Sequence, residues 1–353
     1  MKRKRPPRNR PNQVIVLTGG DPAGIGPELI ESILPEITDS KKAILYFFTS
    51  DKKFLNHFMK RAGNISSEFQ IISYQEYSEI VQSDKIDSLF LKCRRILVDL
   101  SGLDVYRDWS LARPGKGSGL LAFEALRLAC DFIQKYGCLG LCTAPLSKEW
   151  VAKGTGKKFA GHTDYLAERF NSKVLMLMHG KKISVIPLTV HIPLAKVSKE
   201  LEKIVKSPVL ISQLTQIQRL KIFRKKRWAL CGVNPHSGEG GHIGKDEVRY
   251  LDSIGIQWRD AGLPVDGPMS ADAVFLPEAI SQYRLVFSAY HDQGLIPFKA
   301  LEGKSGINVT LGLPFIRSSP DHGTAFGIAE KRKADPESMR NAFYAVCDGE
   351  LKY

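Results

Sequence analysis

Short apolar runs that end in turns rich in glycine and polar residues recur along this chain and constrain its fold more than any other feature. The run Val14–Leu17 contains β-branched residues and leads into the glycine-rich turn at 19–26. Similar runs lie at 43–48, 139–142, 228–231 and 285–289. Between them, residues 120–135 repeat apolar side chains at helical spacing. Because strands buried on both faces read as continuous apolar runs, the alternation predicts an α/β fold with a largely parallel sheet.

The glycine-rich turn itself matches neither of the common phosphate-binding patterns. It does not follow the spacing G-x-G-x-x-G, and no Gly-Lys-Ser/Thr follows it. The usual dinucleotide fingerprint and the P-loop are therefore not predicted. Its position still matters, because α/β proteins bind ligands at the carboxyl ends of their strands.

Length and composition narrow the class of protein further. At roughly 150 residues per domain, a chain of this length predicts two domains or one large one. Six cysteines in 353 residues, without paired C-x-x-C spacing, indicate reduced thiols. No apolar run reaches the roughly 18 residues of a membrane span. We therefore expect a cytoplasmic protein.

The amino terminus supplies a large share of the net charge of +14. Residues 1–12 hold six lysines and arginines and no acid, which leaves +8 on the other 341 residues. We expect this segment to be a solvated, disordered tail. A polyanion-binding protein acting through the tail is the distant alternative. Neither a nucleic-acid partner nor a membrane partner is expected.

Five polar segments indicate chemistry rather than packing. They are the stretches 161–164, 191–194, 234–241, 290–294 and 308–324. Five of the eight histidines lie in these segments. His236 and His291 each follow an apolar run closely, as residues at the carboxyl ends of strands do. Neutral imidazoles suit zinc and similar divalent metals, but no H-x-x-x-H pair is present. A metal site would need residues from distant parts of the chain.

Two cations are candidates for binding an anion. Arg317 lies among hydroxyl-bearing residues and glycines, and its guanidinium can hold a phosphate or carboxylate through two hydrogen bonds. Lys299 follows His291 by eight residues and is a candidate anion ligand or proton carrier. From the residues alone we predict an α/β enzyme with an anion site and a candidate three-histidine metal centre.

Seven of these stretches, taken in order, resemble the 4-hydroxythreonine-4-phosphate dehydrogenase family of pyridoxine biosynthesis. They are TGGDPAGIGPELI (18–30), TAPLSKEW (143–150), GHTDYLA (161–167), NPHSGEGGHIG (234–244), GPMSADAVF (267–275), YHDQGLIPFK (290–299) and NVTLGLPFIRSSPDHGTA (308–325). The resemblance runs from about Val14 to the carboxyl terminus. It implies the two-domain isocitrate/isopropylmalate dehydrogenase-like fold, α/β with largely parallel sheets and an inter-domain cleft.

The resemblance also implies a domain organisation and an assembly. The first α/β domain is expected to combine residues 13–145 with 305–353. The second is expected to span 146–304 and to make most of the dimer contacts. The implied assembly is a homodimer whose active site is shared between its subunits.

Individual residues take roles from the same resemblance. A divalent metal (zinc, magnesium or cobalt) is implied at His191, His236 and His291. The phosphorylated substrate is implied to contact His162, Thr163, Lys299, Asn308 and Arg317. NAD or NADP is implied without the usual fingerprint, with contacts at His322, Gly323 and Thr324.

The implied reaction is oxidation of the substrate at C3, followed by loss of carbon dioxide from the resulting β-keto acid. The general base is left open between Asp272 and Lys299. Val190, Ser318 and Pro320 depart from the usual family residues. They leave room for the same chemistry on a related four-carbon sugar acid phosphate, threonate or erythronate 4-phosphate.

Overall fold

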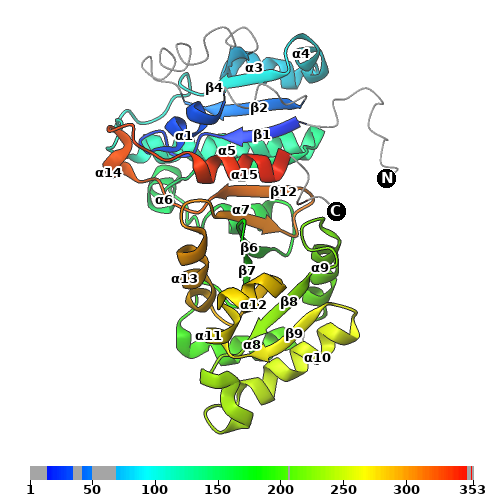
Figure 1. Ribbon diagram of the computed structural model, residues 1–353. Helices are drawn as coiled ribbons and strands as arrows, with labels where there is room; N and C mark the ends of the chain where they lie inside the picture. Colours follow the sequence, from blue (N-terminus) through cyan, green and yellow to red (C-terminus); the bar gives the residue numbers. More distant parts are fainter. Residues whose placement is uncertain (1–13, 35–41, 50–68, 206, 348–350, 352–353) are drawn as a thin grey trace. The chain divides into compact units, whose positions relative to one another are not determined.

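The structure is a computed structural model that describes residues 14–34, 42–49, 69–205, 207–347 and 351 (Figure 1). The basic tail expected at 1–12 lies outside the described residues. The chain forms two compact units. The first unit combines the chain up to Ser172 with Leu313–Cys347, and the second comprises Lys173–Gly312.

The sheet of the first unit is parallel throughout its described strands. Its order is β3 (Phe69–Ser73), β4 (Arg95–Asp99), β2 (Ala43–Phe48), β1 (Val14–Thr18), β5 (Gly140–Thr143) and β12 (Ile316–Pro320). Every residue of β1 and β2 is buried, which explains their unbroken apolar sequences. The expectation of an α/β fold with largely parallel sheets is confirmed here.

Helices connect these strands. They are α1 (Gly26–Ile33), α3 (Tyr74–Gln82), α4 (Ile86–Lys92), α5 (Lys116–Tyr136), α6 (Lys148–Thr155), α7 (His162–Arg169), α14 (Phe326–Ala329) and α15 (Glu337–Cys347). The long helix α5 packs on β1 and β2, while α15 packs on β12 and β5. At the start of α5 the exposed carboxylate of Asp108 accepts hydrogen bonds from the amides of Lys116 and Gly117. These amides have no partner within the helix, so Asp108 caps it.

The boundary between the units differs from the one expected from the sequence. Residues 146–172 belong to the first unit rather than the second, and the second unit ends at 312 rather than 304. Helix α6 packs on α5, and the ring of Phe123 on α5 contacts Phe159 and Tyr165 edge to face. These contacts hold α6 and α7 against the first unit.

The sheet of the second unit is mixed. Its order is β11 (Ile307–Leu311), β6 (Leu175–His179), β7 (Ser184–Pro187), β10 (Tyr283–Ser288), β8 (Arg227–Cys231) and β9 (Val265–Met269). Strands β7, β10, β8 and β9 run parallel to one another, whereas β6 runs antiparallel to both of its neighbours. Four neighbouring strands therefore place their carboxyl ends at the same edge.

The helices of this unit pack around that sheet. They are α8 (Val197–Val205), α9 (Pro208–Arg219), α10 (Asp252–Asp260), α11 (Ala271–Val274), α12 (Pro277–Gln282) and α13 (His291–Glu302). Short helical turns lie at Leu194–Lys196, Pro235–Gly241 and Glu247–Leu251. No helix in the described part of the chain is long and apolar enough to cross a bilayer.

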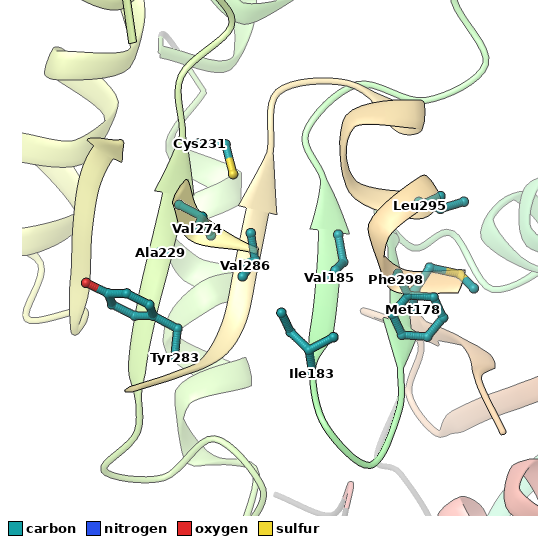
Figure 2. Packing of buried hydrophobic residues seen from close by; sticks show 10 residues of the cluster. All are labelled: Met178, Ile183, Val185, Ala229, Cys231, Val274, Tyr283, Val286, Leu295 and Phe298. Carbon is teal, nitrogen blue, oxygen red and sulfur yellow. The ribbon is translucent and has the colours of Figure 1, made fainter. Parts of the chain in front are cut away.

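The core of the second unit fixes helix α13 to the sheet (Figure 2). Val185 on β7, Val286 on β10 and Phe298 on α13 belong to one cluster and have no exposed surface. Each such side chain contributes roughly 1.5–3 kcal/mol through its burial. The positions of strand ends and of the first turn of α13 are therefore set by packing.

Candidate functional site

Three of the histidines singled out in the sequence follow neighbouring strands of the second unit. His191 comes after β7, His291 after β10 and His236 after β8. Asp272 follows β9, the next strand in the sheet. Because these four strands are parallel, all four residues lie at one edge of the sheet, where α/β proteins bind their ligands.

Hydrogen bonds tie the histidine-bearing turns together. The Thr189 hydroxyl donates to the carbonyl of Ala289 over 2.8 Å, which joins the turns after β7 and β10. The Gln293 side chain accepts from the Ala289 amide (2.7 Å) and donates to the Gly232 carbonyl (2.6 Å), which joins the turns after β10 and β8. Sequence reasoning missed Thr189 and Gln293. Their one signal was that each lies two residues from a histidine.

Two of these histidines face each other, and two adopt an unusual backbone conformation. The ring centroids of His191 and His291 are 5.8 Å apart. The φ angles of His191 and His236 are both 53°, in the left-handed region. That conformation costs roughly 1–3 kcal/mol for a residue with a side chain and persists where the surroundings enforce it, often at functional sites.

The donor chemistry suits a divalent metal, since imidazoles are common ligands of zinc and cobalt. Among the described residues, however, no group of three or more histidine, cysteine, aspartate or glutamate side chains is arranged to hold a metal ion. The structure thus brings His191 and His291 together. His236 lies at the same edge of the sheet but does not form a group of three with them.

The two proposed proton carriers, Asp272 and Lys299, have different surroundings. A hydrogen bond from the Ser270 hydroxyl is the main cause that lowers the pKa of Asp272, and the charge of His236 lowers it further. A carboxylate with a lowered pKa is a weak base at neutral pH. Lys299 is exposed and lies in the last turn of α13. It is about 12 Å from His291 along the helix axis at ~1.5 Å per residue. The structure does not group it with the histidines.

A second group of polar residues lies within the first unit. Arg317 on β12 is 3% exposed, and its Nη2 donates to the Thr143 hydroxyl at the end of β5 over 2.7 Å. Burial lowers the pKa of Arg317 to about 10. Burial also holds the pKa of His162 well below its usual range, and the charges of Arg317 and Lys148 lower it further. His162 is therefore a neutral imidazole beside two cations.

Two proposed substrate contacts carry buried polar atoms without hydrogen-bond partners. They are Nε2 of His162, in the first turn of α7, and Oδ1 of Asn308, on β11 of the second unit. Buried polar atoms in native proteins nearly always have a partner, so each of these atoms fits a ligand. Thr163 follows His162 in the first turn of α7 and is half-buried.

The glycine-rich turn packs against the segment that holds the proposed cofactor contacts. The amide of Ile25 donates to the Thr324 carbonyl over 3.0 Å. Gly24 allows this approach, because a Cβ at that position would lie 2.6 Å from the same oxygen. His322 and Gly323 are exposed beside it. A cavity of about 50 Å³ lies next to this contact, lined by Gly24, Trp109 and eight other residues.

Asp21, in the same turn, is a buried carboxyl group that sequence reasoning did not assign. Its Oδ1 accepts from the Ala23 amide over 3.0 Å, whereas Oδ2 is buried without a partner. Burial raises the pKa of Asp21 to about 6, although the hydrogen bond from the Ala23 amide lowers it in part. The carboxyl group is thus ionised at neutral pH in an environment that favours its neutral form.

We expect Asp21→Asn to stabilise the protein above pH 6 and to leave its stability unchanged near pH 4. The folded protein binds a proton on Asp21 more tightly than the unfolded chain does. The stability that comes from this protonation is therefore fully present below pH 4. It is lost as the pH rises through 6, and at pH 8 the burial costs about 3 kcal/mol. The Tm should therefore rise by several degrees at pH 8.

Asp108→Asn serves as the control with the opposite sign. The amides of Gly117 and Lys116 lower the pKa of Asp108, with the Gly117 bond as the largest cause. Asp108→Asn should therefore lower the Tm at neutral pH, and this loss should disappear only as the pH falls below the ordinary carboxyl pKa of about 4. Thermal unfolding of both variants from pH 2 to 8 measures the difference, and a lower Tm of Asp21→Asn at pH 8 contradicts the prediction.

Fold and site together define the class of protein. Two units with mostly parallel sheets, each with polar residues converging from turns and helix starts, form an α/β protein that binds ligands at strand ends. The model of the family described as "Pyridoxal phosphate biosynthetic protein PdxA" matches residues 41–346.

Individual relatives match over nearly the whole chain. The 4-hydroxythreonine-4-phosphate dehydrogenase of Paracoccus denitrificans is 33% identical over 339 residues, covering 92% of this chain and 94% of the relative. The protein of that name from Aquifex aeolicus is 33% identical over 353 residues, covering 96% and 98%. The chain belongs to the PdxA family.

Solved structures agree with this assignment. The crystal structure of 4-hydroxythreonine-4-phosphate dehydrogenase from Klebsiella pneumoniae has a TM-score of 0.71 at 29% identity, covering 96% of this chain and 99% of that one. A terephthalate 1,2-cis-dihydrodiol dehydrogenase from Burkholderia xenovorans shares the fold at a TM-score of 0.59 and 21% identity, covering 96% and 98%. These comparisons confirm the family that the sequence motifs indicated.

Proposed function

We propose that the protein is a metal-dependent, NAD(P)-linked oxidoreductase that acts on 4-phosphohydroxy-L-threonine. Oxidation at C3 gives 2-amino-3-oxo-4-phosphooxybutanoate, which loses carbon dioxide to form 3-amino-2-oxopropyl phosphate, a step of pyridoxal phosphate biosynthesis. The observation that carries the proposal is the match to relatives of that name over more than nine-tenths of this chain.

The substrate's anionic groups are assigned to the first unit. The buried cation of Arg317 and the charge of Lys148 make the surroundings of His162 electropositive, which favours a phosphate or carboxylate. His162 contributes Nε2 and Thr163 its hydroxyl, while Asn308 offers Oδ1 to a donor of the substrate. Lys299 remains a predicted substrate contact, and only the resemblance of its sequence motif to that of the family supports this role.

The reaction at C3 removes a hydride and the hydroxyl proton. A divalent metal held by His191, His236 and His291 would supply Lewis-acid stabilisation of the negative charge that develops at the C3 oxygen, and a bound nicotinamide coenzyme would take up the hydride. His322, Gly323 and Thr324 are the proposed contacts to that coenzyme. The hydroxyl proton needs a base, for which Asp272 and Lys299 remain the two candidates.

A homodimer with shared sites is part of the proposal. His191 and His291 are close in one chain, whereas His236 does not complete a group of three with them. We propose that histidines of both subunits complete each metal site. The metal ion is zinc, magnesium or cobalt, which bind imidazole and oxygen ligands to different degrees.

A related substrate is the second candidate, because the sequence departs from the family pattern near the site. Val190 lies between Thr189 and His191 and offers no hydroxyl. Ser318 has a structural partner, since its hydroxyl donates to the Ala342 carbonyl on α15 over 2.6 Å. The changes at Val190 and Pro320 are therefore the ones that bear on threonate or erythronate 4-phosphate as the substrate.

We expect metal-loaded protein to reduce NAD or NADP with 4-phosphohydroxy-L-threonine and to lose this activity with a chelator. The measurement compares that substrate with D-threonate and D-erythronate 4-phosphates, each with and without chelator. Turnover of the sugar acid phosphates alone would move the protein to the second candidate function. Absence of turnover with all three substrates would contradict both.

A further inference from the structure

The segment that carries His236 is held in a strained conformation. From His236 to Gly240, five consecutive residues have φ between 44° and 77°. His236, Ser237 and Glu239 are not glycines, and each left-handed residue with a side chain costs roughly 1–2 kcal/mol. Such a run persists only where neighbouring groups enforce it.

The carboxylate of Glu247 supplies that enforcement. It is 3% exposed, and its Oε1 accepts from the amides of Val233 (2.7 Å) and Asn234 (2.8 Å). Its Oε2 accepts from Nδ2 of Asn234 over 3.0 Å. Gly238 packs directly on this carboxylate, since a Cβ there would lie 2.4 Å from Oε2. One side chain therefore contacts both the residues that lead into the strained run and the glycine at its middle.

The local backbone at Glu247 is also unusual. Glu247–Leu251 forms a π-helical turn that leads into α10. Single π-turns within helices are rare and occur frequently at functional sites. Here the turn begins with the residue that binds the strained segment.

We propose that Glu247 is a positioning residue, which holds the left-handed segment Pro235–Gly241 so that His236 stays at the ligand-binding edge beside β8 and β9. This inference rests on the proposed function for the role of His236 itself. The contacts of Glu247 with the segment do not depend on whether His236 binds a metal, because all of them lie within one chain.

Glu302 provides a matched control in the same unit. It is 7% exposed, and its Oε1 accepts from the amides of Lys182 (2.7 Å) and Ile183 (2.9 Å). Its Oε2 accepts from the Lys181 amide over 2.9 Å. These residues precede β7 (Figure 2, Ile183), so Glu302 acts at the edge opposite to the histidines. At either position, a glutamine would place its side-chain NH₂ group, a donor, against a backbone amide that is also a donor.

The experiment compares full-length Glu247→Gln and Glu302→Gln with the unmodified protein, without metal and then with Zn²⁺ alone. In the metal-free protein, Glu247→Gln should raise amide hydrogen exchange in 233–241 and speed acylation of His236 by diethyl pyrocarbonate several-fold. Acylation of His191 and His291 should not change. Glu302→Gln should raise exchange at 181–183 and leave His236 unaffected.

Zn²⁺ affinity, measured by calorimetry, tests whether this positioning serves the metal site. Loss of a group that orients a ligand typically lowers metal affinity by roughly 10- to 100-fold. We expect that loss in Glu247→Gln and none in Glu302→Gln. An equal loss in both variants, or unchanged exchange and acylation in Glu247→Gln, would overturn the inference. If the unmodified protein binds no Zn²⁺, the proposed metal centre fails, and exchange and acylation still decide the role of Glu247.

Discussion

Arg317→Met is expected to lower kcat/KM for the phosphorylated substrate roughly 30- to 5,000-fold, which corresponds to about 2–5 kcal/mol of lost binding to a buried charged partner. Arg317 is 3% exposed and lies beside neutral His162, so its charge interacts with a bound anion in a poorly solvated environment. Methionine has a similar length and no charge.

The fold should survive this substitution. Replacing a buried charge with an apolar side chain of similar volume is often neutral or stabilising, and the hydroxyl of Thr143 loses only a donor. Unchanged Tm together with a large loss of kcat/KM would separate binding from folding. Arg95→Met is the control, because Arg95 is also buried in the sheet of the first unit, over the ring of Phe69.

A substrate without its phosphate distinguishes the group that Arg317 binds. If Arg317 holds the phosphate, Arg317→Met and the unmodified protein should differ little in kcat/KM on 4-hydroxy-L-threonine. If it holds the carboxylate, the loss should be as large on that compound. Retention of full activity by Arg317→Met on both compounds would remove Arg317 from the site.

Local sequence patterns predicted those parts of the fold that depend on burial. The apolar runs at 14–17 and 43–48 are strands because both faces of a parallel sheet are covered. The helical spacing at 120–135 lies within α5. The basic composition of the stretch 199–227 gives no sign of burial, yet the stretch contains the end of α8 and all of α9, whose Leu214 and Ile217 are buried.

The composition of the candidate site was predictable, but its geometry was not. The sequence identified His191, His236 and His291 by their neighbours, yet 100 residues separate the first from the last. Their common edge follows from the strand order β7, β10, β8, and that order depends on pairing between distant segments. No local pattern specifies such pairing, because register and neighbours are set by packing of the whole sheet.

The residues that support the site were the hardest to predict. Gln293 and Glu247 act through backbone amides and carbonyls of turns that are distant in sequence. Any glutamine or glutamate can make such bonds, so residue type carries no signal. The sequence gives a stronger signal for Asp21, since this residue lies within the glycine-rich turn next to an apolar strand.

Removing any one of the three proposed metal ligands is expected to lower kcat roughly 1,000-fold or more, since a bound dication supplies several kcal/mol of charge stabilisation. The variants are His191→Ala, His236→Ala and His291→Ala, each with the unmodified protein as reference. Steady-state kinetics in excess Zn²⁺ measures the loss. If a variant keeps its activity, the histidine that it lacks is not a metal ligand.

Mixing these inactive variants tests which histidines come from the same subunit. The rings of His191 and His291 are 5.8 Å apart in one chain, so we expect this pair to act together at one site. Subunits with His236→Ala mixed with subunits carrying His291→Ala should then recover up to about a quarter of native activity, because half of the randomly formed dimers contain one intact site.

The mixture of His191→Ala with His291→Ala should stay inactive, because each reassembled site then lacks one member of the close pair. Recovery in this mixture, with or without recovery in the other, would assign the His191 and His291 of one chain to different sites despite their proximity. No recovery in any mixture, with subunit exchange verified by mass spectrometry, would show that each site is built within one chain. The shared site would then be wrong, whereas the roles of the individual histidines would stand on the single variants.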